Sequence, residues 1–435
     1  MAAQSPKLFL GTLAAIAMSC LAHDAAAGEM NLDKLFSCHD QLIQCAECGD
    51  AAQSCGELCQ SDCGCPVAFD GSFVQIFQSV VDGGNRQRSS LGGSGRYGLT
   101  FDLGKMGVHD GMSLRMVTDH QVGDYVSTDA GVIIPPGFAA ITPTASTHDP
   151  IVTNLILTQV VNENWTILAG KMDTLDGDRN PFASGRGRNG FMNTSLLLPI
   201  NGVPIVPFAT LGAGAVFSME GNPVASVLVL NANDTTTEVG LSELFKDGAV
   251  IVGSLNLPFS LNDKTGIQTL NVAYSTKTFT SLSQDPRVIL PNVPLAPTTG
   301  GWVAWWSGTQ FIQQFDPKNN PMAGWGFFGR FGASDDNVAP ITYWANAGLG
   351  GSSCISGRQN DRWGVGWFYG SFSDNLGPVV TAALNVGAQT TGVEMFYNMA
   401  VTENFFITPD IQVLKPGSNA ASTAVVAGIR GEIRI

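Results

Sequence analysis

The sequence predicts an all-β chain whose antiparallel strands close into a membrane-spanning barrel. The chain has 51 glycines, and only 13% of its residues are charged. Its segments are short, alternate between apolar and polar residues, and are separated by Gly, Asn, Asp and Pro, which favours strands and turns over helices. Beyond the N-terminal segment, no stretch approaches the ~20 uninterrupted apolar residues of a membrane helix, so any crossing must use strands.

The last stretch, Ala424 to Ile435, shows the strand pattern most clearly. From Val425 onward every second residue is apolar or small, and the alternate set from Gly428 onward is Gly, Arg, Glu and Arg. A period of two indicates a strand with one apolar and one charged face. In a soluble barrel the charges face water outside, whereas in an outer-membrane barrel they line a wet lumen and the apolar side chains face lipid.

The first segment indicates export. Lys7 precedes an apolar run from Leu8 to Ala22, and Ala25 to Ala27 supply the small residues that a signal peptidase requires. We interpret residues 1–27 as a cleaved secretory signal, because the run is too short for a membrane anchor. Lipoprotein cleavage at Cys20 is a second alternative, which the absence of Leu three positions earlier disfavours.

Residues 28–70 are predicted to form a small cysteine-rich segment ahead of the barrel, which we assign to residues 71–435. Once Cys20 leaves with the signal, eight cysteines remain, an even number that favours up to four disulfides in an exported protein. A zinc site is the alternative, since His39 lies near a Cys-x-x-Cys pair, but the irregular spacing favours disulfides over a metal. The eight disulfide candidates are Cys38, Cys45, Cys48, Cys55, Cys59, Cys63, Cys65 and Cys354.

Several strands and connections can be placed in the body of the chain. Paired strands are expected at Arg96 to Leu103 with Met112 to Thr118, and at Ile151 to Val161 with Trp165 to Lys171. Long connections are expected at Ser127 to Pro150, Asp285 to Gly301 and Asp335 to Pro340. The first of these is unusually long unless it is functional or folds inward.

Later strands carry large aromatic residues on one face. Arg330 alternates with Phe327, Gly329 and Phe331, and Arg362 lies opposite Trp363, Val365, Trp367 and Tyr369. In the same way, Thr408, Asp410 and Gln412 alternate with Phe405, Ile407, Ile411 and Val413. This pattern is typical of a lipid-facing exterior with aromatic girdles and a polar lumen. A soluble core would give the same alternation, but its solvent face would carry more Lys and Glu.

The stretch Lys171 to Asn193 is the most polar part of the body and contains several Asp and Arg residues. It is either a solvated loop or a loop that presents carboxylates and guanidinium groups to hydroxylated solutes. Its Gly-x-Gly-x-x-Gly sequence precedes no helix pattern, which argues against dinucleotide binding. Pro181 replaces the glycine of a calcium loop, so no metal or other cofactor is expected here.

Composition also argues against two other classes of function. The net charge of −14 disfavours a nucleic-acid partner. An enzyme is equally disfavoured, because none of the four histidines after the signal lies in a recognisable motif and no Gly-x-Ser-x-Gly or His-Glu-x-x-His sequence is present.

Four stretches together resemble the carbohydrate-selective porin family. They are AGWGFFGRFG (Ala323 to Gly332), GLGGSSCISGRQNDRWGVGWFY (Gly348 to Tyr369), VEMFYNMAVTENFFITPDIQVLKPG (Val393 to Gly417), and LAGKMDTLDGDRNPF with the following FMN (Leu168 to Asn193). The similarity covers most of Arg96 to Ile435. It implies an outer-membrane barrel of about sixteen strands and passive diffusion of monosaccharides or related sugars.

In such a pore, Arg and Asp side chains and aromatic faces would replace part of the hydration of a passing sugar without binding it tightly. Strand face selects three candidates and the motif-bearing loops select six more. The nine pore-lining candidates are Asp178, Arg179, Arg186, Arg188, Arg330, Arg358, Asp361, Arg362 and Glu394. Each of them is also open to the alternative that it forms a salt bridge within the wall or a loop.

Two other roles remain open at this point: a general diffusion porin, and a structural envelope barrel cross-linked through its cysteines. The expected partners are outer-membrane lipid and small sugars. The barrel is also a candidate for homo-oligomer assembly, and the cysteine-rich segment for contact with another envelope component.

Overall fold

The computed structural model describes residues 66–144, 148–177, 180–377, 381 and 385–435. The chain divides into two compact units, one of Met1–Ala68 with Phe101–Ser113 and one of Phe69–Thr100 with Leu114–Ile435. In the first unit, the described residues include a turn in which the Val108 N–H donates to the Leu103 carbonyl oxygen at 2.8 Å. The cysteines at positions 38–65 lie outside the described residues, and Cys354 is exposed.

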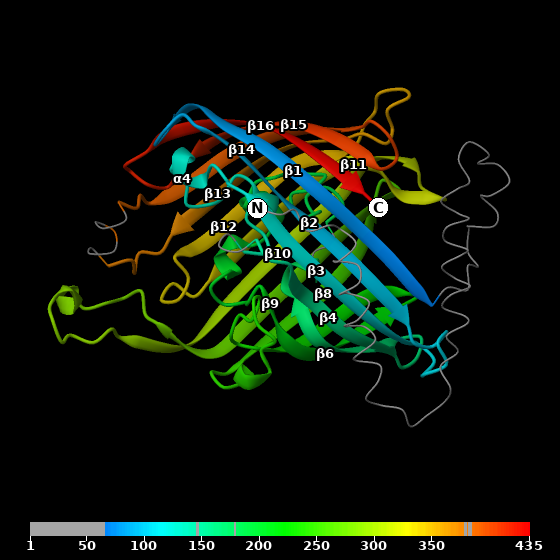
Figure 1. Cartoon of the computed structure of the whole chain (residues 1–435), viewed down its shortest axis with the longest axis horizontal. Helices are drawn as coiled ribbons and strands as arrows, with labels where there is room; N and C mark the ends of the chain where they lie inside the picture. The colour runs from blue at the N-terminus through cyan, green and yellow to red at the C-terminus, as the bar shows by residue number, and fades with distance from the viewer. Residues whose placement is uncertain (1–65, 145–147, 178–179, 378–380, 382–384) are drawn as a thin grey trace, which may run out of the picture. The chain divides into compact units, whose positions relative to one another are not determined.

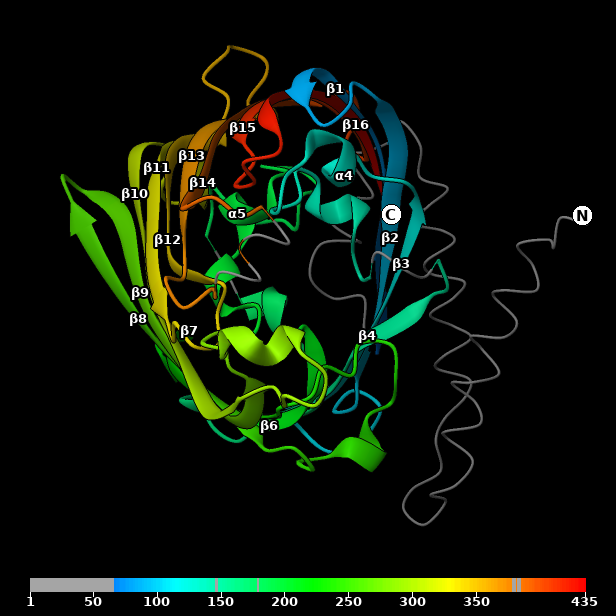
Figure 2. The same ribbon diagram turned by 90° about the vertical axis from the view of Figure 1, so that its left-hand side faces the viewer.

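The described residues contain sixteen strands, which form a closed antiparallel barrel (Figures 1 and 2). The strands are β1 (Val67–Gly84), β2 (Ser89–Asp102), β3 (Met112–Gly123), β4 (Ile151–Val160), β5 (Trp165–Asp173), β6 (Ala209–Met219), β7 (Asn222–Asn231), β8 (Ala249–Leu261), β9 (Lys264–Thr280), β10 (Pro297–Asp316), β11 (Asn320–Ser334), β12 (Ile341–Ser352), β13 (Arg362–Phe372), β14 (Gln389–Ala400), β15 (Phe405–Lys415) and β16 (Ser422–Arg434). Each strand pairs with its neighbours in sequence, and β16 closes the barrel on β1. The predicted barrel of about sixteen antiparallel strands is confirmed.

Some boundaries differ from those that the sequence predicts. β1 and the first half of β2 precede Arg96, in the part of the predicted barrel where the sequence places no individual strand. β10 begins at Pro297, inside the expected connection from Asp285 to Gly301, because Thr299 still pairs with Thr278 of β9. The expected connection from Asp335 to Pro340, by contrast, fits between β11 and β12 without a shift.

The period-two alternation predicted for the later strands is confirmed on both faces of the wall. On β11, β13, β15 and β16, the exposed apolar residues point outward, whereas the Arg, Asp, Gln and Glu positions point inward, together with a few buried apolar residues such as Phe328 and Phe368. Exposed apolar side chains continue around the outer face on alternate positions, including Leu155, Leu157, Ile167, Val227, Val229, Ile251, Leu255, Leu270, Val272, Phe327, Phe331, Val365, Trp367, Val393, Met395, Ile411, Val413, Ile429 and Ile433. A continuous apolar exterior of this kind is the surface that a bilayer requires.

The two ends of the barrel have different connections. One end carries short turns at 161–164, 220–221, 262–263, 317–319 and 401–404, together with the connection 353–361. Asn262 and Asp263 both adopt positive φ, as a two-residue turn between twisted strands requires. The other end carries longer connections, among them 124–150, 174–208, 232–248 and 281–296. In outer-membrane barrels short turns face the periplasm and long loops face outward, which orients the chain.

Two of the long connections fold into the barrel in their described parts, 124–144 with 148–150 and 174–177 with 180–208; we call them the lumen loops. The first lumen loop carries α4 (Ser127–Ala130) and η1 (Phe138–Ala140). The second carries η2 (Thr174–Gly177), α5 (Thr194–Leu197) and η3 (Ile200–Gly202). Figure 2 shows α4 and α5 inside the ring of strands. The short helices η4 (Leu241–Glu243) and η5 (Pro286–Ile289) lie in other connections. None of the described helices has the length and apolar character needed to cross a bilayer.

The largest apolar core lies between the lumen loops and the inner wall. Phe191 packs edge-on against Phe328 of β11 and Phe396 of β14, with ring centroids 5.5 Å and 4.9 Å away. Gly364 and Gly366 of β13 make room for it, since a Cβ on either would lie 2.8–2.9 Å from the Phe191 ring. The part of the polar stretch at residues 180–193 is therefore packed against the wall.

Candidate functional site

Inward-pointing side chains of β11 and β12 hold the second lumen loop against the wall. The two terminal nitrogens of Arg330 donate to the carbonyl oxygens of Leu196 and Ala183, both at 2.9 Å. The indole N–H of Trp344 donates to the Ser195 carbonyl oxygen at 3.0 Å. Arg330 is only 2% exposed, so its guanidinium supplies the loop backbone with hydrogen bonds in place of water.

Glu394 of β14 accepts two backbone hydrogen bonds from the same loop. Its carboxylate oxygens bind the N–H of Met192 at 2.5 Å and that of Asn193 at 2.8 Å, and its side chain is fully buried. The Asn193 amide donates to Gln412 of β15 at 3.0 Å, and Gln412 donates to the Pro136 carbonyl oxygen at 2.7 Å. Because Pro136 belongs to the first lumen loop, this network joins both loops to one place on the wall.

Two more arginines make similar contacts. Arg430 of β16 donates to the carbonyl oxygens of Gly187 and Gly190, the latter at 2.7 Å. Arg362 of β13 donates to the Pro181 carbonyl oxygen at 2.6 Å. These arginines, like Arg330, satisfy loop carbonyl groups that would otherwise be buried without a partner.

Arg188 joins the second lumen loop to β1 and β2, the strands that follow β16 around the barrel. It donates to the hydroxyl oxygens of Ser72 on β1 and Ser94 on β2, both at 3.0 Å. Burial lowers the pKa of the Arg188 guanidinium to about 10, so the group stays protonated at neutral pH.

A turn with three left-handed residues places the remaining loop arginine. Gly185, Arg186 and Gly187 have φ angles of 88°, 56° and 75°, which explains why glycines flank the arginine in this sequence. The turn brings the Arg186 guanidinium to 2.8 Å from a carboxylate oxygen of Asp173, at the end of β5. These glycines therefore shape a turn in the loop.

Arg186 belongs to a charge cluster made of Arg96, Asp119, Asp173 and Arg186. Arg96 of β2 donates to Asp119 of β3 at 2.7 Å and to Asp173 at 3.3 Å. The arginine side chains are 15% and 14% exposed, whereas the carboxylates are 5% exposed or less. The Arg186 guanidinium also lies over the rings of Phe138 and Phe208, at 5.9 Å and 5.6 Å from their centroids.

A polar cleft of about 250 Å³ adjoins this cluster. Arg96 lines the cleft together with Asp70, Gly71, Ser72, Glu432, Arg434 and Ile435. Arg434 donates to Glu432 at 2.7 Å, and its guanidinium stacks 4.1 Å above the ring of Phe406. The charge cluster and this cleft form a continuous series of guanidinium groups, carboxylates and aromatic faces along the inner wall, which we call the polar track.

The predicted pore-lining residues therefore fall into separate groups. Arg186 lies in the polar track, whereas Arg188, Arg330, Arg362 and Glu394 hold the second lumen loop. Arg358 and Asp361 pair with each other at 2.7 Å in the connection between β12 and β13, away from the polar track. Asp178 and Arg179 lie outside the described residues.

Sequence reasoning did not select Arg96, Asp119, Glu432 or Arg434 as site residues. A usable signal was present, because Glu432 and Arg434 lie on the charged face of the last predicted strand and Arg96 begins another. The sequence alone does not show which residues of other strands lie next to each of these side chains. Among the described residues, no group of His, Cys, Asp and Glu side chains is arranged to hold a metal ion.

A closed sixteen-strand barrel with an apolar exterior, two loops folded inward and a charged inner wall is the architecture of an outer-membrane porin. The chain belongs to the carbohydrate-selective porin, OprB family, which it matches over residues 88–434. The family resemblance seen in the sequence motifs is thereby confirmed. The protein is a sugar porin of the bacterial outer membrane, and its family and fold are those of a channel.

Solved structures share the fold at low sequence identity. The high-pH structure of Pseudomonas putida OprB superposes with a TM-score of 0.73 at 17% identity, covering 89% of this chain and 97% of that one. The low-pH structure of the same protein gives a TM-score of 0.53 at 14% identity, covering 89% and 98%. Among curated proteins, none matches this sequence significantly.

Proposed function

We propose that the protein lets monosaccharides diffuse passively along the polar track, with Arg96, Arg186 and Arg434 contacting the sugar. The observation that carries this proposal is the partial exposure of arginines whose carboxylate partners are buried. Each guanidinium has five N–H donors. Its carboxylate partner fixes its direction, and the part of the side chain that stays exposed, 15% for Arg96, 14% for Arg186 and 36% for Arg434, can contact a sugar in the lumen.

Aromatic rings support the same assignment. Phe138 and Phe208 lie beside Arg186, and Phe406 lies beneath Arg434. Flat guanidinium groups stacked on rings lose little conformational freedom when a solute binds. Contacts of this kind are weak individually, and a pore needs such weak, repeated contacts because the solute must also leave.

Liposome swelling tests the proposal. Refolded protein is compared for influx of glucose, a neutral non-sugar of similar size, and a disaccharide. We expect glucose to enter faster than the size-matched non-sugar, with the disaccharide slower than both. Equal rates for glucose and the non-sugar would instead establish a general diffusion pore.

Export, cross-linking and assembly complete the proposal. Removal of residues 1–27 and disulfide formation among the cysteines at positions 38–65 and Cys354 would together fix the mass of the exported protein. The intact mass of protein from membranes, measured with and without reductant and alkylation, tests both. Homo-oligomer formation is tested by the molecular mass of the protein in detergent.

A further inference from the structure

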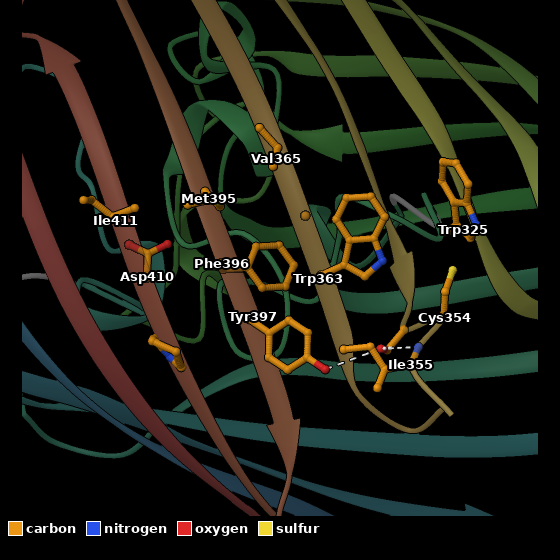
Figure 3. Close-up of a pocket in the computed structure, with 13 residues that line it drawn as sticks. Trp325, Cys354, Ile355, Trp363, Val365, Met395, Phe396, Tyr397, Asp410 and Ile411 are labelled. Atoms are coloured by element: carbon orange, nitrogen blue, oxygen red, sulfur yellow. Dashed lines mark hydrogen bonds between the residues drawn. The ribbon is translucent and has the colours of Figure 1, made fainter. Parts of the chain in front are cut away.

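The outer wall carries an apolar groove near the short-turn end of the barrel, which we call the outer groove (Figure 3). Its volume is about 600 Å³, and it extends from β11 to β15. Trp325, Trp363, Val365, Met395 and Ile411 form its sides, and all five are outward-facing positions of their strands. Because these positions belong to the lipid-facing surface, the medium that fills the groove is the bilayer.

Gly351 allows Trp325 and Trp363 to form one side of the groove together. It pairs with both Trp325 of β11 and Trp363 of β13, so it separates the two indoles in one outward row. A Cβ at Gly351 would lie 2.2 Å from the Gly324 carbonyl oxygen, and its φ of 138° is rarely adopted by other residues. With no side chain between them, the indole rings lean together at 5.9 Å.

A hydrogen-bonded network of Tyr397, Asp361 and Arg358 adjoins the end of the groove nearest the turn. The hydroxyl of Tyr397, a lining residue, donates to a carboxylate oxygen of Asp361 at 2.8 Å. The Arg358 Nε donates to the same oxygen at 2.7 Å, and the Arg358 side chain is 42% exposed. Asp361 raises the pKa of Arg358, which therefore remains a cation.

From its apolar sides to the adjoining Tyr397, Asp361 and Arg358, the groove presents groups in the order in which a membrane lipid would match them. An acyl chain is apolar and narrow, and a phosphate headgroup is anionic and lies at the level of the interfacial aromatic residues. Arg358 retains N–H donors beyond the Nε that Asp361 accepts, and guanidinium groups bind phosphate oxygens well. The short-turn end faces the periplasm, and its leaflet is where a glycerophospholipid would meet the groove.

We propose that the outer groove is a discrete binding site for one glycerophospholipid, with an acyl chain between Trp363 and Met395 and the phosphate at Arg358. The site is separate from the polar track, because the five side chains that form its sides point away from the lumen. Sugar flux and lipid retention are therefore independent measurements.

Native mass spectrometry of the full-length protein, delipidated and then titrated with phosphatidylethanolamine, tests the proposal. Met395→Trp fills the groove, and Val393→Trp is the matched control, because Val393 faces outward two residues away on the same strand but does not line the groove. We expect one retained lipid on the parent protein, at least a tenfold loss in Met395→Trp, and no change in Val393→Trp. Sugar flux in liposomes should be unchanged in both variants.

A second variant tests the phosphate contact. Arg358→Gln should lower retention of phosphatidylethanolamine severalfold while leaving retention of diacylglycerol unchanged. Equal loss in Met395→Trp and Val393→Trp, or equal retention of diacylglycerol and phosphatidylethanolamine by the parent protein, would overturn the proposal. So would preferential retention of lipid A, or a detergent-stable dimer that Met395→Trp abolishes, since each assigns the groove to another occupant.

Discussion

Arg330 and Arg186 both point into the barrel, yet their surroundings differ. Arg330 is 2% exposed and donates to two carbonyl oxygens of the lumen loop. Arg186 is 14% exposed and pairs with the carboxylate of Asp173. A cation that is enclosed by backbone carbonyl groups organises the loop, whereas one that is oriented by a buried carboxylate keeps a surface toward the lumen. Most inward side chains of the sector β11–β16 thus anchor the loops, whereas the polar track, whose wall residues come from β2, β3, β5 and β16, offers charge to solutes.

Removing Glu394 should break the anchoring sector and give the largest effect. In Glu394→Ala the N–H groups of Met192 and Asn193 lose their acceptor, at about 1–3 kcal/mol each, so the unfolding free energy should fall by about 2–6 kcal/mol. Unfolding of the protein in detergent by guanidinium chloride measures this free energy. Glu394→Gln keeps one acceptor oxygen and should lose less; equal losses in the two variants would contradict the two-bond account.

Placing an arginine on the other face of β11 should give the next largest effect. Phe327 faces lipid near the middle of the strand, three residues before the well-tolerated Arg330. Phe327→Arg should therefore cost about 2–4 kcal/mol, the range for a cation at the bilayer midplane. Unfolding from lipid vesicles measures this cost, with Phe327→Leu as the control. If Phe327→Arg left the unfolding free energy unchanged, position 327 would not lie in lipid.

Substituting Arg186 should change the sugar preference of the pore and leave its unfolding free energy unchanged. Arg186→Met removes a donor from the polar track but leaves Asp173 paired with Arg96. We expect the preference for glucose over a size-matched non-sugar to fall several-fold, about 1 kcal/mol. Swelling rates give this ratio, and Arg88→Met, at an exposed connection, is the control. An unchanged ratio with intact folding would remove Arg186 from the sugar path.

The smallest effect is expected in an exposed outer connection. Arg287 lowers the pKa of Asp285, so the pair contributes above the ordinary pKa of Asp and loses its contribution as the pH falls through the lowered value. Both groups are solvent-exposed, where such pairs contribute little. Asp285→Asn should leave sugar flux and unfolding unchanged from pH 7 down to pH 4. A marked acid dependence that disappears in Asp285→Asn would show that this connection matters to the pore.

The sequence was sufficient for the wall but not for the loops. Alternation around Arg330, Arg362 and Glu394 predicts correctly that they point inward, because side-chain direction in a strand follows from local geometry. Their partners lie 134 to 202 residues away in the chain, in Leu196, Pro181 and Met192. No local pattern encodes such distances, so the sequence could not distinguish an arginine that anchors a loop from one that meets a solute.

The same limit explains the residues that were missed. Arg96, Asp119 and Asp173 come from three different strands and form a cluster only after the barrel curves. Gly364 and Gly366 were visible in the sequence, but their role, which is to make room for the Phe191 ring, becomes clear only in the structure. Composition predicted a glycine-rich wall without showing which glycines admit a ring.

The pairing of β1 with β16 also governs how this molecule can assemble. The Ile435 N–H donates to the Gly71 carbonyl oxygen at 2.9 Å, so the wall is completed only when two segments from opposite parts of the sequence meet. Until then two strands present unpaired N–H and C=O groups, which the hydrocarbon interior of a bilayer does not tolerate. Contacts this remote in sequence form slowly. Closure of the wall and insertion into the bilayer should therefore occur as one concerted event, late in folding.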